Sequence, residues 1–413
     1  MKPTNIQCIP EIPNSWDLSK IKYFFYISKS KAHDTNPTVL RLARSGIQVR
    51  DISTNEGQMA ASYEDYNPVQ PGDFLLNTMD LQSGANCNVS EISGVISPAY
   101  ANLRALQNLN PKFFDYYFKC QYWAMAMFAH GKGISFDNRW TMNTDTLLNY
   151  YIPVPPIEIQ NKIVDIINKK CAQVDELIAN QQAQIEKLKE YKQSIITEAV
   201  TKGLDKSAPT KDSGIEWIGD IPSSWNILRG KNVLELLDKS VLPTDDVITC
   251  FRDGEVTLRK NRREEGFTFS EKEIGYQGID IDDLVVHGMD GFAGAIGISD
   301  SRGKASPVLI VLDSMHNKRF LMYYLRSLAY RDIFLALSTG IRVRSCDLRW
   351  NKLSTLQFLV PSIEEQNNIV AYIDNKLEQI DCLITLKEEK IEKLQEYKKS
   401  LIYEYVTGKK EVV

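Results

Sequence analysis

The sequence lacks the features of a membrane protein, a secreted disulfide scaffold or a metalloprotein. No apolar run reaches the roughly 18–20 residues that span a bilayer. The first 16 residues contain three prolines and no apolar segment of a signal peptide, so a cytoplasmic location is expected. The seven cysteines are widely spaced without a C-x-x-C, and the four histidines are scattered. Neither a disulfide framework nor a bound metal is therefore expected.

Motifs of several enzyme classes are also missing. The sequence has no Asp/Asn-Pro-Pro-Tyr/Phe of adenine methyltransferases, no G-x-G-x-x-G that opens a helix, no H-E-x-x-H and no G-x-S-x-G. Gly291, Gly294 and Gly297 form a G-x-x-G-x-x-G pattern, which we interpret as a tight turn. The net charge of −4 is slightly acidic, which by itself argues against nucleic-acid binding. A chain without catalytic activity of its own is expected, and its 413 residues predict two to three domains.

What the sequence does contain is a long internal repeat. Residues 154–201, which begin VPPIEIQ, align without a gap with residues 360–407, which begin VPSIEEQ. About half of the aligned positions are identical, and Tyr191 corresponds to Tyr397, an offset of 206 residues. Shared helix propensity alone does not produce identity at this level, so the two segments are expected to be copies of one structure.

Shorter and weaker sequence matches precede each copy of the repeat. IPNSW from Ile12 matches IPSSW from Ile221, and GVISPAY from Gly94 matches GKASPVL from Gly303. Diverged globular units therefore alternate with closely similar helices. The predicted boundaries are 1–153 for the first globular domain, 154–206 for the first helix, 207–359 for the second globular domain and 360–413 for the second helix.

Apolar residues recur at alternating steps of three and four in both repeated segments. This spacing predicts long amphipathic helices with a coiled-coil seam, and about 45 residues at about 1.5 Å each give roughly 65–70 Å. The predicted seam residues are Ile163, Ile167, Val174, Leu177, Ile185, Leu188, Ile195 and Ala199 in the first helix, and Ile369, Ile373, Ile380, Leu383, Ile391, Leu394, Leu401 and Tyr405 in the second.

The two helices are expected to pair antiparallel with each other, because both carry the same seam. The alternatives are that each helix packs on its own domain, or that helices pair between chains. Cys171 and Cys382 lie on or beside the seam and are expected to be buried.

The globular units mix short strand-like runs, turns and one aromatic-rich helical stretch each, which predicts an α+β fold. Arginine and lysine in their loops are candidate DNA contacts, since arginine recognises guanine and phosphate bidentately. The alternative for any single residue is a solvated surface charge. The second unit contributes Arg252, Arg259, Lys260, Arg262, Arg263, Arg302, Lys304, Arg342 and Arg344, and the first contributes Lys29, Lys31, Arg41, Arg44, Arg50, Lys132 and Arg139.

Taken together, these motifs resemble the specificity subunit of type I restriction–modification systems. The resemblance rests on the paired P-x-I-E-x-Q starts at Pro155 and Pro361, each followed by a helix with YK-x-S-[IL]-I near its end. It also rests on the DSGIEWIGDIP-x-x-W segment at 212–225 and on G-x-x-S-P in each globular unit. The first unit keeps only I-P-x-x-W of the longer segment.

The resemblance implies an α+β chain with two target-recognition domains and an antiparallel pair of spacer helices, related by a pseudo-two-fold repeat. Each domain would read one half of a bipartite DNA target. Two adenine-N6 methyltransferase subunits would dock on the helices, and endonuclease/translocase subunits would complete the complex. S-adenosylmethionine, ATP and Mg²⁺ would be bound by those partners.

Three further expectations follow from the repeat. Similar helices with diverged domains predict two unlike half-sites rather than a palindrome. A rigid helix pair predicts a fixed distance and phase between the half-sites, which insertion of about four residues in one helix would change. The pseudo-symmetry predicts that the end of the second helix lies near the start of the first domain. The rival hypotheses are a coiled-coil scaffold that binds no DNA and an enzyme with degenerate motifs. A separate or a fused methyltransferase–nuclease partner is equally compatible with the sequence.

Overall fold

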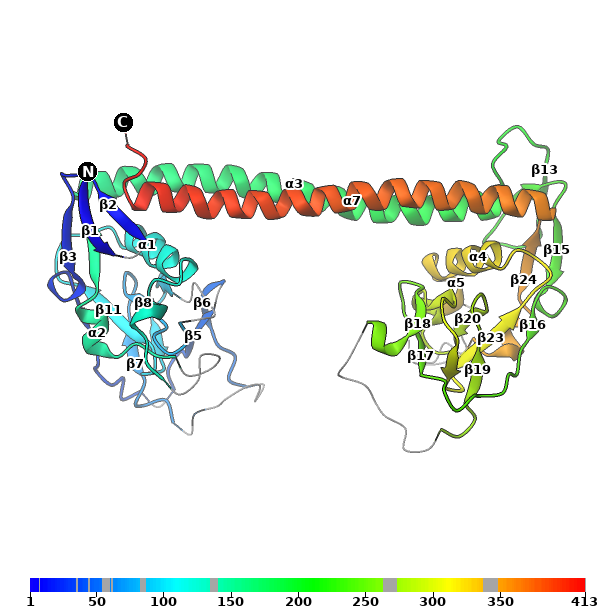
Figure 1. Cartoon of the computed structure of the whole chain (residues 1–413), viewed down its shortest axis with the longest axis horizontal. Coiled ribbons are helices and arrows are strands. Elements are labelled where there is room, and N and C mark those ends of the chain that lie inside the picture. Colours follow the sequence, from blue (N-terminus) through cyan, green and yellow to red (C-terminus); the bar gives the residue numbers. More distant parts are fainter. Residues whose placement is uncertain are drawn as a thin grey trace. The chain divides into compact units, whose positions relative to one another are not determined.

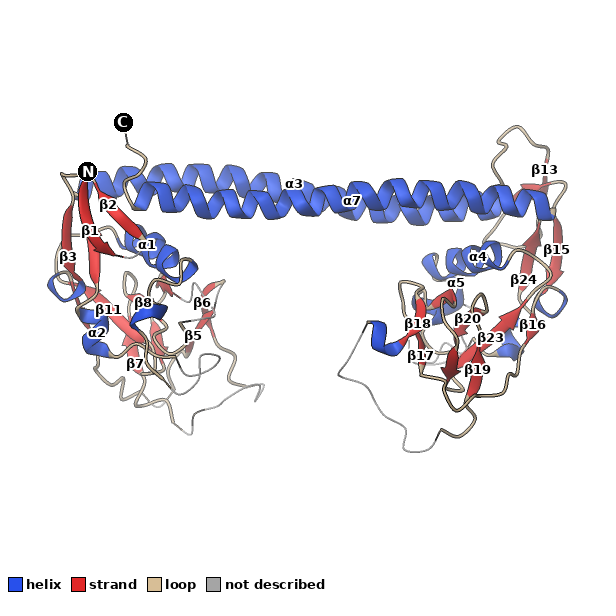
Figure 2. Cartoon of the chain, viewed as in Figure 1, coloured by secondary structure: helices blue, strands red, loops and turns tan. Residues whose placement is uncertain are grey.

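The computed structural model describes residues 1–412 except 7, 35, 44, 54–59, 61, 82–86, 134–139, 263–272 and 337–347. The chain divides into two compact units. Unit 1 comprises Met1–Gln181 and Glu389–Val413, and unit 2 comprises Gln182–Glu388. Both units mix helices and strands, as Figure 2 shows, so the predicted α+β class is confirmed.

Unit 1 contains a four-stranded antiparallel sheet in the order β4-β11-β8-β9, together with the two-stranded ladders β1-β2, β3-β12, β5-β6 and β7-β10. The strands are β1 (Lys2–Ile6), β2 (Ile9–Ile12), β3 (Asp17–Lys20), β4 (Phe25–Ile27), β5 (Leu40–Ala43), β6 (Gly46–Val49), β7 (Asn67–Val69), β8 (Phe74–Leu76), β9 (Cys87–Val89), β10 (Gly94–Ile96), β11 (Ala101–Ala105) and β12 (Tyr151–Val154). The short helices are η1 (Ile21–Tyr23), α1 (Pro111–Trp123), η2 (Phe128–His130) and α2 (Thr144–Leu148).

The aromatic-rich helix of unit 1, α1, begins where the sequence supplies a cap. The Asn110 side chain accepts the backbone N–H of Lys112, and Pro111 occupies the first turn, where its missing N–H costs nothing. One face of α1 then packs on the sheet. Phe118 stacks on Phe74 with ring centroids 5.1 Å apart, and such rings make up much of the buried core.

Unit 2 repeats this set of ladders. Its four-stranded sheet has the order β16-β23-β20-β21, and its two-stranded ladders are β13-β14, β15-β24, β17-β18 and β19-β22. The strands are β13 (Thr210–Asp212), β14 (Asp220–Pro222), β15 (Asn226–Arg229), β16 (Glu235–Leu236), β17 (Ile248–Cys250), β18 (Val256–Leu258), β19 (Gln277–Ile279), β20 (Leu284–His287), β21 (Ile296–Ile298), β22 (Gly303–Ala305), β23 (Leu309–Asp313) and β24 (Gln357–Val360). The short helices are η3 (Gly230–Asn232), η4 (Arg259–Asn261), η5 (Gly291–Ala293), α4 (Lys318–Tyr330), α5 (Ile333–Ala336) and α6 (Trp350–Leu353).

The two long helices, α3 (Ile157–Lys202) and α7 (Ile363–Val406), contribute to both units and lie side by side (Figure 1). In unit 1, Lys398 Nζ lies 2.6 Å from Asp175 Oδ2. In unit 2, Lys192 Nζ lies 2.6 Å from Asp381 Oδ1. The later residue of one helix pairs with the earlier residue of the other, so the helices run antiparallel. The predicted antiparallel pairing is confirmed.

The end of α7 packs on the start of the chain within unit 1. The Tyr403 hydroxyl donates to the carbonyl of Cys8, and Leu401 and Tyr405 share a buried cluster with Ile9. The N- and C-terminal ends lie close together in Figure 1. In unit 2 the end of α3 packs in the same way on the hairpin that follows it, where Val200 and Ile221 are buried together. The predicted proximity of the chain ends is confirmed.

Among the residues that the structure describes, no helix is both long enough and apolar enough to span a membrane.

Candidate nucleic-acid interface and helix pair

A glutamine clamp joins each globular part to its long helix. In unit 1, the side-chain oxygen of Gln160 accepts the backbone N–H of Asn110 at 2.9 Å, and its amide nitrogen donates to the Pro155 carbonyl at 2.8 Å. Asn110 is also the N-cap of α1, and its side chain donates to Asn161 at 2.7 Å. The Gln160 residue is 1% exposed. The glutamine of the P-x-I-E-x-Q motif therefore fastens the start of α3 to the start of α1.

Unit 2 contains the same clamp. Gln366 accepts the N–H of Asn317 at 2.9 Å and donates to the Pro361 carbonyl at 2.9 Å. Asn317 caps α4 and donates to Asn367 at 2.7 Å. The three bonds that the two clamps share agree within 0.1 Å, and Gln366 also contacts His316 Nδ1 at 3.3 Å. The repeated motif thus has a physical role, which is to set how a globular part meets the helix pair.

The seam between α3 and α7 has a regular register once polar positions are included. Each seam residue of α3 is buried or half-buried, and so is the α7 residue 206 positions later. They are Ile163, Ile167, Cys171, Val174, Ile178, Gln181, Ile185, Leu188, Lys192, Ile195 and Ala199, followed in α7 by Ile369, Ile373, Leu377, Ile380, Ile384, Lys387, Ile391, Leu394, Lys398, Leu401 and Tyr405. The steps alternate between three and four residues over most of this length, as in a coiled coil.

Two predicted seam residues and one predicted buried cysteine are wrong. Leu177 is 48% exposed and Leu383 is 47% exposed, whereas their neighbours Ile178 and Ile384 occupy the seam. The apolar pattern pointed to the leucines because the next seam positions, Gln181 and Lys387, are polar. Cys171 is buried as predicted, but Cys382 is exposed. The other predicted seam residues are buried or half-buried.

Leu177 and Leu383 instead belong to two matching exposed apolar pairs. Tyr191 is 55% exposed and Tyr397 is 52% exposed, and each tyrosine lies two heptads after the leucine of its own helix. The Lys398–Asp175 ion pair sets a register that places Leu177 and Tyr397 at similar heights in unit 1. The same register places Leu383 and Tyr191 at similar heights in unit 2. We call these two sets the outer pairs.

The basic cluster of unit 2 is interleaved with acids. Arg252 Nη2 donates to Asp290 at 2.9 Å, and Lys260 Nζ lies 2.6 Å from Asp246. Arg262 contacts Asp253 and Glu255 at 2.7 and 2.9 Å, and its guanidinium lies 4.2 Å from the centroid of the Phe251 ring. The structure thus brings these cations together around β17 and β18. Arg259 is half-buried, with its Nε 3.4 Å from Thr249 Oγ1.

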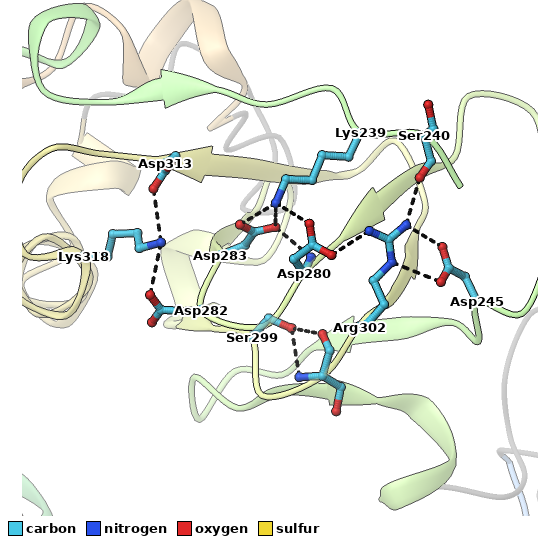
Figure 3. Close-up of polar contacts among 11 residues, drawn as sticks. Lys239, Ser240, Asp245, Asp280, Asp282, Asp283, Ser299, Arg302, Asp313 and Lys318 are labelled. Atoms are coloured by element: carbon cyan, nitrogen blue, oxygen red, sulfur yellow. Dashed lines mark hydrogen bonds and ion pairs between the residues drawn. The ribbon is translucent and has the colours of Figure 1, made fainter. Parts of the chain in front are cut away.

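Arg302 lies at the centre of a structural network, as Figure 3 shows. Its Nε and Nη2 donate to the two carboxylate oxygens of Asp245, its Nη1 donates to Asp280 at 2.6 Å, and Nη2 also donates to the Ser240 carbonyl. Lys239 and Arg302 hold the pKa of Asp280 below the usual aspartate range, Arg302 does the same for the pKa of Asp245, and the bonds to Asp245 and Asp280 raise the pKa of Arg302. Arg302 is thus held in an internal network, and its predicted contact with DNA stays a prediction.

The other basic candidates have varied surroundings. Lys304 pairs with Glu273 at 2.8 Å in unit 2. In unit 1, Lys29 and Lys132 are exposed, Lys31 pairs with Asp65 at 2.7 Å, and Arg41 bonds the neutral side chain of Gln48. Arg50 is half-buried. Lys29 and Lys31 border a hollow of about 470 Å³ that Asn67, Thr78 and Tyr100 also line. The candidates Arg44, Arg139, Arg263, Arg342 and Arg344 lie outside the described residues.

One pair of buried acids was missed by the sequence analysis. Asp73 and Asp283 occupy the same turn before equivalent strands, β8 and β20, and both are about 5% exposed. Asp73 accepts from Arg104 and Asn102 of β11, and Asp283 accepts from Lys239 at 2.7 Å. The available local signal was a turn in which an aspartate accepts the backbone N–H three residues before it. The N–H of Gln70 donates to Asp73, and the N–H of Asp280 donates to Asp283.

Comparisons with known proteins agree with this architecture. The family model of the type I restriction modification DNA specificity domain matches residues 87–187, from β9 into α3. The type I restriction enzyme MjaVIII specificity subunit of Methanocaldococcus jannaschii is 24% identical over 279 residues, and the putative MjaX specificity subunit of the same organism is 24% identical over 281 residues. The alignments cover 63% and 66% of this chain, and 62% of the length of each relative.

In sequence and in fold, the chain is similar to specificity subunits of type I restriction–modification systems. A chain from a study of complex assembly and conformational transition of the type I R-M system superposes with a TM-score of 0.65 at 15% identity, covering 96% of this chain and 98% of that one. The HsdS subunit from Thermoanaerobacter tengcongensis superposes with a TM-score of 0.50 at 14% identity, again over 96% and 98%. The predicted resemblance and fold are confirmed.

Proposed function

We propose that the chain is the DNA-recognition subunit of a type I restriction–modification complex and reads a target made of two unlike parts, one part through each unit. The observation that carries this proposal is a contrast. The clamps at Gln160 and Gln366 share three equivalent bonds, whereas the basic side chains of the two globular parts do not correspond. A repeated attachment with unlike surfaces suits two readers of different sequences.

In this proposal the helix pair carries two copies of one adenine-N6 methyltransferase subunit, and endonuclease/translocase subunits complete the restricting complex. The outer pairs support the duplication, because Leu177 with Tyr397 and Leu383 with Tyr191 present nearly equal exposed apolar surface in each unit. Exposed aromatic and leucine side chains of this kind are typical of protein interfaces. S-adenosylmethionine, ATP and Mg²⁺ belong to the partner subunits, which perform the chemistry.

The ion-paired cations fit a subunit that reads DNA within a larger complex. Arg252, Lys260 and Arg262 each contact an acid, so phosphates must compete with internal carboxylates. Partner subunits would then supply much of the phosphate affinity, while this chain contributes base readout. The isolated chain is accordingly expected to bind DNA weakly and with a strong salt dependence.

The decisive experiment is methylome sequencing of a host that expresses the chain with its methyltransferase. The expected result is N6-methyladenine in one bipartite motif with unlike halves. Arg252→Gln together with Arg262→Gln should relax one half only, by about 1–3 kcal/mol per lost base contact. Lys398→Gln serves as the control, because its ion pair lies in the helix pair. Methylation of a palindrome, or relaxation of both halves, would contradict the assignment of one half to each unit.

Docking on the outer pairs is tested by co-purification. Leu177→Glu with Tyr397→Glu should remove one of two bound methyltransferases, and Leu383→Glu with Tyr191→Glu should remove the other. Because these side chains are exposed, the folded chain should be unaffected. Retention of both subunits by either double variant would exclude this surface. A coiled-coil scaffold without DNA function, the main alternative, predicts no methylation in any combination of partners.

A further inference from the structure

The loop at 239–246 connects β16 to β17 in unit 2, and it is held by side chains from outside its own length. Lys239 Nζ reaches Asp280 at 2.8 Å and Asp283 at 2.7 Å. The Asp245 carboxylate accepts the N–H of Leu242 at 2.8 Å from within the loop, and it accepts both Nε and Nη2 of Arg302 from beyond it. The Asp245 side chain is only 2% exposed. Its fixed position therefore depends on Arg302.

Gly278 of β19 provides the space in which this network forms. A Cβ atom at this position would lie 2.7 Å from Arg302 Nη2 and 2.6 Å from the Ser240 carbonyl. The Gly278 N–H also donates to the Lys239 carbonyl at 2.7 Å. The guanidinium of Arg302 can thus approach the strand closely and reach Asp245, Asp280 and Ser240 at once (Figure 3).

The end of the loop is joined by hydrogen bonds to the basic cluster around β17 and β18. Asp246, which follows Asp245 directly, accepts Lys260 Nζ at 2.6 Å. The Asp246 carbonyl accepts the N–H of Lys304, and the carbonyl of Val247 accepts the N–H of Arg259 at 2.8 Å. A continuous path of bonds therefore runs from Arg302 through Asp245 and Asp246 to η4, which carries Arg259 and Lys260.

We propose that Arg302 is a positioning residue for DNA recognition by unit 2, acting through Asp245 and Asp246 on Lys260 and its neighbours. This proposal rests on the proposed function, and it assigns Arg302 no contact with DNA. In unit 1 the residue at the position of Arg302, just before the corresponding G-x-x-S-P motif, is Ser93, which cannot form the same bidentate contact. Changes to the network should therefore affect one half of the target.

The test uses the full chain with its methyltransferase, read by methylome sequencing. Arg302→Gln and Asp245→Asn should increase methylation at targets mismatched in one half by about tenfold, the discrimination of a single base pair. Arg302→Lys should give a smaller increase, since lysine keeps the charge but cannot hold Asp245 bidentately. The same half should respond to Arg252→Gln with Arg262→Gln.

The matched control is Lys318→Gln. Lys318 bridges Asp282 and Asp313 in the same unit at 3.2 and 3.1 Å, without a bond to the loop. If this variant relaxed the same half as strongly, or if Arg302→Gln relaxed both halves or neither, the proposal would be overturned. Asp246→Asn is a variant that should not disturb folding, because the side chains of Asp246 and Lys260 are 58% and 66% exposed. This variant should relax the same half of the target. An unchanged motif in that variant would also overturn the proposal. Absence of any bipartite motif with the unmodified chain would instead refute the proposed function.

Discussion

Units 1 and 2 differ most where each buries the same acid. Asp73 and Asp283 occupy equivalent turns, but Asp73 is neutralised by Arg104 from β11 and Asp283 by Lys239 from the loop after β16. The position of Arg104 is occupied by Asp313 in β23, which pairs with Lys318 instead. The fold thus requires a paired carboxylate in this turn and leaves the source of the positive charge free.

The junction with the helices shows the opposite behaviour. The clamp residues, the cap residues and the antiparallel ion pairs are the same in both units. Tyr116 donates to Asn168 in unit 1, and Tyr323 donates to Asp374 in unit 2, both at 2.5 Å. The attachment to the helices is therefore nearly the same in both units, while the interior and surface of the two globular parts differ. The predictions below test this contrast.

The largest effect is expected from removing the cation of one buried pair. Arg104→Met leaves the Asp73 carboxylate, 6% exposed, with only neutral donors, and should cost about 2–3 kcal/mol of unfolding free energy. Lys239→Met should cost a similar amount through Asp283. Hydrogen exchange should show the loss only in the unit that carries the change. Lys31→Met, which breaks an exposed pair with Asp65, should leave the unfolding free energy almost unchanged. Equal losses in all three variants would refute the contrast.

A smaller and equal effect is expected at the two clamps. Gln160→Ala and Gln366→Ala each leave a half-buried N–H, of Asn110 or Asn317, without its acceptor, at a cost of about 1–2 kcal/mol. Hydrogen exchange at the start of α1 or α4 should accelerate accordingly. Gln379→Ala is the control, since Gln379 is exposed and bonds only within α7. A strong effect in one unit and none in the other would mean that the junctions are not equivalent.

The sequence predicted the scaffold well, because its repeat and its seam are periodic and local. It misplaced Leu177 and Leu383 because a search for apolar residues passes over a seam position occupied by Gln181 or Lys387. The candidate site was harder to predict. Arg302 looked like a free cation, but its partners Asp245 and Asp280 lie 57 and 22 residues away in the chain. Only the folded sheet brings them together, so no local pattern could have revealed the network.

The smallest expected effect is a pH dependence confined to unit 2. His287 is the last residue of β20, at the position that Asn77 occupies directly after β8. Its Nδ1 accepts the N–H of Asp290 at 3.0 Å, much as Asn77 Oδ1 accepts the N–H of Met79. Burial lowers the pKa of His287; the carboxylate of Asp290 opposes this shift, and Arg252 adds to it.

A histidine whose folded pKa lies below the unfolded value of about 6.5 binds its proton first in the unfolded chain. Its contribution to stability is therefore complete above about pH 6.5 and is lost as the pH falls through the folded pKa. His287→Asn gives unit 2 the residue type that unit 1 has at this position, and it should reduce the loss of stability on acidification. The measurement is the difference in urea midpoint between about pH 7.5 and about pH 5.5. Part of the slope should remain, because burial also lowers the pKa of His316. If the variant kept the full slope, or if stability rose on acidification, His287 would not be the group that distinguishes the two units.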